Sequence, residues 1–434
     1  MQRTGEWRSP ARKAHVRILR TIGTFIIVAL LTSGATLGAL VYGPGLLGAP
    51  AAASDVTVIW PEAHSERMAP EPPPKVERFT ILAVGDLMTH GPQMDSARTG
   101  SVYDFTSCFA PVASRVAAAD LAIGNLETVL GGVERGYTGY PTFNAPDSYA
   151  EALVGAGFDV LTHANNHSLD RGATGLLRTR EVLDRLGAMT TGTARTAEEA
   201  EGILVADIRG VKVAVLAYTY GMNGFQPPTD KPWMVNVINE TKMTAGVKRA
   251  RASGVDLVIV SIHNGLEYQR QPSASQERLE RAIVDAGADV VLGSHPHVIQ
   301  PMEVVSAKNA DGSPRTAFII HSLGNFVSNQ RERFRDTGLL LQFGFEKNLK
   351  TGVTELVSVE YVPVWVDDTG VAGKEHRVLP IREVLEDDAY PGVTSAERVK
   401  MRQAWDDTTT HLGSVEATSA DPAALVFFGT PLTR

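Results

Sequence analysis

Six runs of apolar residues recur along the middle of the chain, and each ends in a short polar motif. The runs cover residues 79–84, 121–123, 158–161, 255–262, 288–292 and 317–320. Their length and β-branched content predict buried strands. Because ligands of α/β proteins bind outside the carboxyl ends of the strands, we expect the six motifs to share one rim of a sheet.

The polar motifs carry carboxylate, carboxamide and imidazole groups, which are oxygen and nitrogen ligands for metal ions. In chain order they are Gly85-Asp86-Leu87-Met88, Asn125-Leu126-Glu127, Asn165-Asn166-His167 with Asp170, His263-Asn264-Gly265-Leu266-Glu267-Tyr268, Gly293-Ser294-His295-Pro296-His297 and Ser322-Leu323-Gly324-Asn325-Phe326. Six such coincidences predict a paired metal site.

Helical patterns alternate with these strands. Apolar spacing predicts helices over 147–156, 175–186, 247–252 and 275–286, and another strand over 211–218. Two later segments, 339–345 and 353–362, predict strands that follow one another without a helix. Alternating α/β units followed by β-β segments indicate a layered α/β domain with mixed sheets over residues 79–366.

The amino-terminal part of the chain has the pattern of a membrane protein. Residues 22–43 are apolar or small without a charge, and a basic tail, residues 1–21, precedes them. This predicts a single transmembrane helix, with the tail in the cytoplasm and the main domain outside the cell membrane. A cleaved signal peptide, processed near the alanine-rich residues 48–53, remains the alternative. Proline-rich residues 44–78 predict a tether.

The carboxyl-terminal part, residues 367–434, is polar and helix-biased around 395–405 and contains no motif that we can interpret. We expect it to be an extension of the main domain.

Charge narrows the choice of partner. The net charge is −8, although residues 1–20 hold six basic residues against one acidic residue, a balance of +5. The rest of the chain therefore carries −13, which argues against nucleic acid as a partner. An anionic substrate would have to be attracted locally, most simply by bound cations. Cys108 is the only cysteine, which excludes an internal disulfide and a cysteine ligand cluster.

The histidines predict where such cations bind. His263, His295 and His297 end two separate strands, and neutral imidazoles that converge from several elements are typical of metal sites. Pro296 restricts the backbone between the last two. His163 and His90 are expected to be structural.

The Asn166-His167 pair combines two functions. A carboxamide oxygen is a neutral ligand for hard ions, and the adjacent imidazole can act as a general acid toward the substrate. Asp170, three residues later, could hold that imidazole in one tautomer.

Together these motifs resemble the CapA/PgsA poly-γ-glutamate capsule-biosynthesis family, a branch of the calcineurin-like metallophosphoesterase superfamily. The resemblance implies a four-layer α/β/β/α sandwich. It implies that Asp86 and His297 hold one divalent ion, that Asn166, His263 and His295 hold another, that Glu127 bridges them and that His167 is the acid. Asn165, Glu267, Tyr268 and Asn325 are expected to bind substrate or surround the ligands.

The chain departs from the superfamily pattern at several of these positions. Met88 stands where the superfamily's first motif has histidine, and Glu127 where it has a bridging aspartate. Asn264 and Arg171 replace aromatic residues that are common in the family.

Two functions fit these features. One is a hydrolase or transferase that uses one or two Mn, Fe, Zn or Mg ions on an anionic polymer or phosphoester. The other is a non-catalytic membrane subunit that binds polyglutamate for a synthase or exporter partner. The resemblance favours a role in the synthesis or export of an anionic capsule polymer, and it leaves open whether that role is catalytic.

Overall fold

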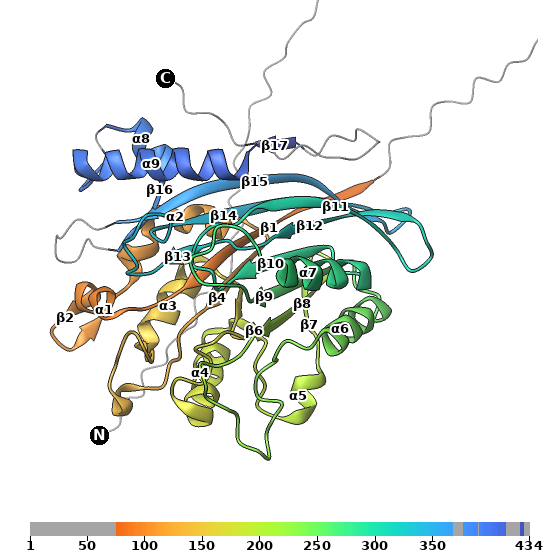
Figure 1. The fold of residues 1–434 in the computed structure, drawn as a ribbon, viewed down its shortest axis with the longest axis horizontal. Coiled ribbons are helices and arrows are strands. Elements are labelled where there is room, and N and C mark those ends of the chain that lie inside the picture. The colour runs from red at the N-terminus through yellow and green to blue at the C-terminus, as the bar shows by residue number, and fades with distance from the viewer. Residues whose placement is uncertain (1–74, 368–375, 389, 414–425, 429–434) are drawn as a thin grey trace, which may run out of the picture. The chain divides into compact units, whose positions relative to one another are not determined.

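Two mixed β-sheets form the centre of the protein in the computed structural model, which describes residues 75–367, 376–388, 390–413 and 426–428 (Figure 1). In the larger sheet the strand order is β16-β15-β14-β1-β4-β5-β6, with β13 beside β1 and β17 beside β15. The strands are β1 (Val76–Leu87), β4 (Leu121–Leu126), β5 (Val160–Thr162), β6 (Met189–Thr191), β13 (Asn325–Val327), β14 (Thr337–Asn348), β15 (Thr354–Val366), β16 (Val378–Pro380) and β17 (Val426–Phe428).

The smaller sheet has the order β11-β12-β10-β9-β8-β7. Its four inner strands run parallel, and the two edge strands run antiparallel to their neighbours. The strands are β7 (Leu204–Ile208), β8 (Val211–Thr219), β9 (Leu257–His263), β10 (Val290–Ser294), β11 (Met302–Lys308) and β12 (Pro314–Ile320).

Helices cover one face of each sheet. The larger sheet packs against α2 (Thr106–Ala118), α3 (Asp147–Ala156) and α4 (Gly172–Leu186), and the smaller sheet against α6 (Glu240–Ala252) and α7 (Ala274–Ala286). The remaining described elements are α1 (Gly91–Ala97), α5 (Ala197–Glu201), α8 (Ile381–Glu386), α9 (Ser395–Leu412), the 3₁₀ turn η1 (Val133–Arg135) and the short pair β2 (Arg98–Thr99) and β3 (Val102–Tyr103).

The two sheets pack face to face, as the alternation of side chains along their strands shows. Ile81 and Ala83 of β1 lie in one apolar cluster with Ile259 of β9, whereas Leu82 and Val84 lie in the cluster that contains α2 and α3. Successive side chains of a strand point to opposite faces, so β1 is buried on both. This explains why residues 81–84 of β1 are apolar without a break.

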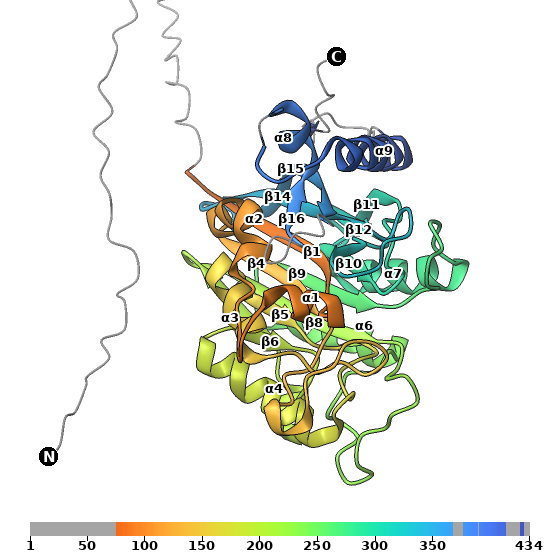
Figure 2. The same ribbon diagram turned by 90° about the vertical axis from the view of Figure 1, so that its left-hand side faces the viewer.

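Part of the predicted carboxyl-terminal extension packs on the larger sheet. Strand β16 pairs with β15, and α8 and α9 lie against this end of the sheet (Figure 2). Trp365 and Leu379 form an apolar cluster there with Met401 and Trp405 of α9. Thr394 begins α9 with a reciprocal capping pair to Glu397, which satisfies backbone donors at its first turn.

The predicted mixed α/β domain is confirmed, and the six apolar runs correspond to β1, β4, β5, β9, β10 and β12. The helix predicted over 247–252 begins earlier, at Glu240, because the Asn239 side chain caps it by accepting from the backbone N–H of Lys242. Strand β1 begins at Val76, inside the predicted tether.

The predicted transmembrane segment, residues 22–43, lies outside the described residues. Among the residues that are described, no helix is both long and apolar enough to cross a bilayer.

Candidate metal centre

The polar strand ends lie side by side because of the register of the two sheets. In the larger sheet, Asp86 of β1 is paired with Asn125 of β4 on one side and Asn325 of β13 on the other. In the smaller sheet, His263 of β9 is paired with Ser294 of β10. Each sheet thus brings a row of polar groups to one edge.

Glycines beside these polar residues allow the segments to approach closely. A Cβ atom at Gly85 would lie 1.9 Å from the carbonyl oxygen of Gly324, and one at Gly293 would lie 1.9 Å from that of His321. No side chain fits at such distances, so glycine is required at both positions. These two glycines therefore allow the neighbouring ligands, Asp86 and His295, to reach their positions.

Glu127 lies at the centre of the site and has no hydrogen-bond partner. Its side chain is fully buried, and neither carboxylate oxygen is hydrogen-bonded within the described part of the chain. The Nε2 atoms of His263, His297 and His167 surround its Oε1 at 3.5, 3.9 and 4.0 Å. A buried carboxylate without a partner costs several kcal/mol unless a cation joins it.

The two central carboxylates titrate in opposite directions. Burial, and then the negative charge of Asp86, raise the pKa of Glu127 well above its usual range. Burial also acts to raise the pKa of Asp86, but the hydrogen bond and charge of His297 outweigh it and hold that pKa well below the usual range. Ligand atoms of the two carboxylates lie within 4.8 Å of each other. Two like charges at this distance repel, and a cation bound between them would allow both to be ionised.

His297 is held in one tautomer by two acceptors. Its Nδ1 lies 3.0 Å from Asp86 Oδ2 and 3.1 Å from Asn325 Oδ1. The Asn325 amide nitrogen donates to Gln330 and to the carbonyl of Arg335, which orients its oxygen toward His297. Nδ1 must therefore carry the proton, and the lone pair of Nε2 is free on the side of Glu127.

His263 and Asn166 meet across the gap between the sheets. The His263 Nε2 atom lies 2.9 Å from Asn166 Oδ1, and its Nδ1 lies 3.1 Å from both Asn125 Nδ2 and Ser294 Oγ. Burial lowers the pKa of His263 well below its usual value, which keeps the imidazole neutral. Only the neutral form of the ring binds a metal.

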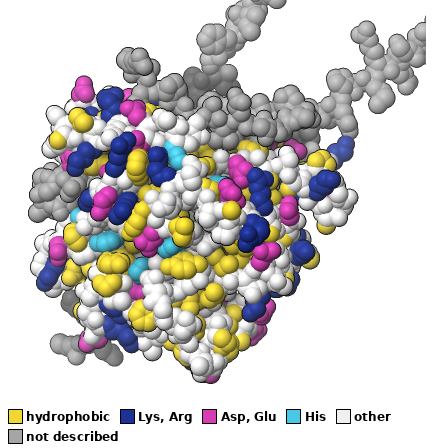
Figure 3. All heavy atoms as spheres, viewed as in Figure 1, with side chains coloured by type: hydrophobic (Ala, Val, Ile, Leu, Met, Phe, Trp, Pro, Cys, Tyr) yellow, Lys and Arg dark blue, Asp and Glu magenta, His cyan; other side chains and the backbone are white. Residues whose placement is uncertain are grey.

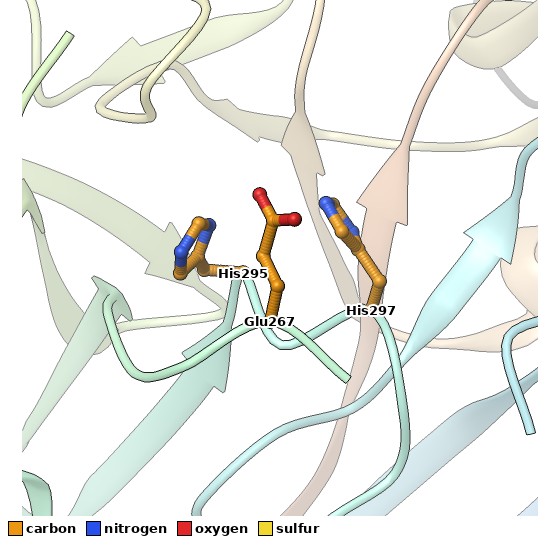
Figure 4. A group of neighbouring side chains, drawn as sticks. All are labelled: Glu267, His295 and His297. Atoms are coloured by element: carbon orange, nitrogen blue, oxygen red, sulfur yellow. The ribbon is translucent and has the colours of Figure 1, made fainter. Parts of the chain in front are cut away.

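Glu267 lies between His295 and His297, and all three side chains point the same way (Figure 4). Ligand atoms of the three lie within 4.8 Å of one another. His295 and His297 have φ angles of 96° and 58°, in the left-handed region that non-glycine residues seldom adopt. Burial lowers the pKa of His295 to about 3, and its Nδ1 has no hydrogen-bond partner among the described residues.

His167 is fixed by Asp170, as predicted for a general acid. Its Nδ1 lies 2.7 Å from Asp170 Oδ2, which also accepts from the backbone N–H of Phe143. The Phe143 ring packs edge-on against the imidazole, with centroids 4.6 Å apart. The free Nε2 atom faces Glu127.

These donors fit divalent ions. The structure forms two groups of candidate ligands, Asp86 with Glu127 and His263, and Glu267 with His295 and His297. Carboxylate and neutral imidazole are suited to Zn, Mn and Fe, and the orphaned carboxylate of Glu127 supplies the uncompensated charge. The second group includes Glu267, which the sequence placed outside the ligand set. Which residue holds which ion stays a prediction.

Two of the predicted surrounding residues lie behind or beside the ligands. The Asn165 side chain donates to Asn125 Oδ1 and to the carbonyl of Leu126, away from the candidate ligands. The Tyr268 ring lies 6.1 Å from that of His297 and is covered by the guanidinium of Arg335, 3.4 Å from its centroid.

The sequence analysis assigned no role to two residues of the site, Asn125, which it included in a motif, and Tyr220, which it did not mention. Asn125 joins the two sheets, because its amide nitrogen reaches both Asp86 and His263. Tyr220 lies just past the end of β8, with its ring 4.5 Å from that of His295. Like the six motifs, Tyr220 follows an apolar run. A single tyrosine is a weak metal ligand, however, so this position alone does not predict a place in the site.

Comparison with solved structures finds phosphoesterases at low similarity. A phosphatase from Mycoplasma pneumoniae aligns at 15% identity and a TM-score of 0.41, over 74% of this chain and 100% of that one. The calcineurin-like phosphoesterase YfkN from Bacillus subtilis aligns at 15% identity and a TM-score of 0.40, over 77% of this chain and 99% of that one.

Curated relatives are more similar in sequence. The capsule biosynthesis protein CapA of Bacillus anthracis is 30% identical over 294 residues, which are 66% of this chain and 68% of that protein. The PGA biosynthesis protein CapA of Bacillus subtilis strain 168 is 32% identical over 221 residues, 48% of this chain and 53% of that protein. The profile of the bacterial capsule synthesis protein family PGA_cap matches residues 80–330, the region that supplies every candidate ligand, and the chain belongs to that family.

Proposed function

We propose that this protein acts in the synthesis or export of an anionic capsule polymer similar to poly-γ-glutamate, through a divalent-metal centre. We further propose that residues 22–43 anchor it in the cell membrane with the metal centre outside, where a membrane synthase or exporter would be its partner. Family membership supports the first statement, and the charge pattern of the amino terminus supports the second.

The buried, unpartnered carboxylate of Glu127 carries the metal proposal. Asp86, Glu127, Asn166, His263, His295 and His297 would hold the ions, with Glu267 beside them. When bound, divalent ions there would neutralise and polarise an anionic group of the substrate.

The residues around the ions have separate tasks. Asn325 and Asp86 keep the His297 proton on Nδ1, and Asp170 does the same for His167. With Nδ1 satisfied, a protonated His167 Nε2 is positioned to give its proton to a leaving group. Phe143 packs on the ring and restricts its rotation. This arrangement favours a hydrolase or transferase.

A non-catalytic polymer-binding subunit is the second candidate. Met88, where the superfamily has a histidine ligand, is 1% exposed and soft, and is therefore a poor ligand for a hard ion. Such a centre could still bind polymer carboxylates through fewer ions.

Substitution of His167 separates the two candidates. In the full-length protein prepared with Mn²⁺, His167→Ala should keep its metal content and lose about 10²–10⁴-fold in turnover of phosphoesters or polyglutamate. His263→Ala should lose metal, whereas His321→Gln, at a buried histidine outside the site, should not. If the unmodified protein cleaves nothing and His167→Ala still supports capsule production, the binding-subunit role stands. A protein without metal would overturn both.

A further inference from the structure

A hollow of about 160 Å³ lies between residues 331–337 and α9. Four of its lining side chains are basic and two are acidic: Arg270, Arg331, Arg333, Lys400, Asp336 and Asp407. The chain as a whole is acidic, with a net charge of −8. A locally basic hollow in an acidic protein indicates an anionic ligand.

Some residues that line the hollow belong to the chain segments that also carry residues of the metal centre. Ile299 lines it, two residues after the candidate ligand His297. The carbonyl of Arg335 accepts a hydrogen bond from Asn325, which also contacts His297. Arg270 lies three residues after Glu267, in the loop that brings that carboxylate to the centre. The loops that carry Glu267, His297 and Asn325 therefore also contribute to the wall of the hollow.

An aromatic side chain held between two guanidinium groups forms one wall. The guanidinium carbon atoms of Arg270 and Arg333 lie 4.2 and 4.8 Å from the centroid of the Phe334 ring. Phe334 has a φ of 77°, a strained conformation for a bulky residue, and such strain is typical of functional segments. Residues 331–335 were not part of the sequence motifs. Arg333 of this segment contacts Asp407 of α9.

The basic surface continues along α9. A second hollow shares Arg333 and Asp407 with the first and adds two basic residues, Arg398 and Arg402, and one acidic residue, Asp406. On the face in Figure 3, Lys and Arg side chains lie among Asp and Glu side chains around the group of histidines.

The acidic side chains of the hollow are already engaged, and two cations are not. Asp407 forms a two-point contact with Arg333, and Asp336 accepts from the Trp365 indole. Lys400 and Arg402 are exposed and have no acidic partner within the described part of the chain. They are available to a ligand.

We propose that this basic groove, formed by residues 331–335, Arg270 and the Arg398–Arg402 part of α9, binds a stretch of a carboxylate-bearing polymer whose next unit lies at the metal centre. The inference rests on the proposed function and adds the path of the substrate. Guanidinium groups pair with carboxylates in a planar, two-point geometry, and repeated cations suit a ligand with repeated carboxylates.

Binding of labelled oligoglutamate to the full-length, metal-loaded protein tests the groove. The double substitution Lys400→Gln with Arg402→Gln should weaken oligomer binding roughly five- to thirtyfold, from two lost charge contacts. Binding of a single labelled glutamate, and the metal content, should stay unchanged. The matched control is Lys242→Gln with Lys248→Gln, which removes two exposed cations from α6 and should leave oligomer affinity unchanged.

Two results would overturn the groove. One is equal oligomer affinity in the groove variant and the control. The other is a groove variant that binds the oligomer as well as the parent does but no longer binds anionic phospholipid vesicles. That result would indicate that the groove contacts the membrane. The proposed function fails on a different measurement. It would be contradicted if the protein bound no divalent metal, whatever its affinity for the oligomer.

Discussion

Glu127 and Glu280 are both buried glutamates next to histidine, but their surroundings differ. Glu280 of α7 is 1% exposed and pairs directly with Nδ1 of His321, whose Nε2 lies 3.6 Å from Glu303. Glu127 is 0% exposed, and three imidazoles stand 3.5–4.0 Å away without contacting it. A carboxylate that is buried for stability is paired within the fold, whereas one that is buried for a ligand is left without a partner.

The largest effect in this comparison should come from Glu127→Gln. Binding of about 10–16 kcal/mol shared among four ligands gives each about 3–4 kcal/mol, or roughly a 100- to 1000-fold loss of metal affinity. The free energy of unfolding of the metal-free protein should not fall, because the substitution removes a buried carboxyl group that has no hydrogen-bond partner within the described part of the chain. Metal analysis and denaturant unfolding in chelator measure the two quantities. Glu280→Gln is the control for metal content, and a variant that keeps its metal would contradict the central position of Glu127.

Glu280→Ala should show the opposite pattern. Removing one partner of a buried pair costs about 3 kcal/mol or more in unfolding free energy, whereas the metal content should remain that of the parent protein. Glu277→Ala, at an exposed position of the same helix, is the control and should change stability by less than about 0.5 kcal/mol. Loss of metal in Glu280→Ala at a temperature where it is folded would remove the distinction between the two sites.

Asn325→Ala tests whether the tautomer of His297 matters. Without the Asn325 oxygen, only Asp86 holds the His297 proton on Nδ1. Loss of such an outer partner typically costs 10–100-fold in metal affinity, which titration calorimetry with Mn²⁺ can measure. Asn309→Ala, on an exposed loop, should bind metal like the parent. An affinity unchanged by Asn325→Ala would show that Asp86 alone suffices.

The smallest effect concerns a buried histidine that has no carboxylate partner. His163 contacts the carbonyl of Thr128 and the hydroxyl of Thr193, and burial lowers its pKa to about 3. The unfolded chain takes up a proton near pH 6.5 and the folded chain does not, so stability falls as the pH drops from about 7 toward 3. Between pH 7 and 5.5 the parent should lose about 1 kcal/mol more than His163→Gln. Parallel denaturant curves at the two pH values measure the difference, and equal losses would contradict the neutral state of His163.

The sequence predicted the strands well, and with them the strand ends at which the candidate ligands lie, because both depend on local pattern. Asp86 and His263 end apolar runs, and parallel strands bring their carboxyl ends to one edge. It did not predict that Glu267 would join His295 and His297, since that depends on the path of the loop after β9. The helix α2 was also missed, because Pro111 inside it removes a backbone donor and disfavours a helix in local terms.

The packing of α9 against the larger sheet was also not predicted from the sequence. Its apolar contacts, Met401 and Trp405, are sparse in a polar segment, and their partner Trp365 lies in the last strand of the domain predicted over residues 79–366. Tertiary packing between distant segments decides such an interface, and no local pattern records it.

The pairing of β1 has a consequence for the order in which the protein folds. Val84 of β1 is hydrogen-bonded in register with Leu340 of β14, and Asp86 meets His297, which is 211 positions away. Contacts between such distant segments require most of the chain to be present before the first strand has both of its neighbours, which slows folding and prolongs exposure of an apolar edge. During synthesis β1 is therefore made first and stays without one of its neighbouring strands until β14 has been made. Refolding of this protein should be slow and prone to aggregation at high concentration, and metal can bind only after the strands that carry its ligands have docked.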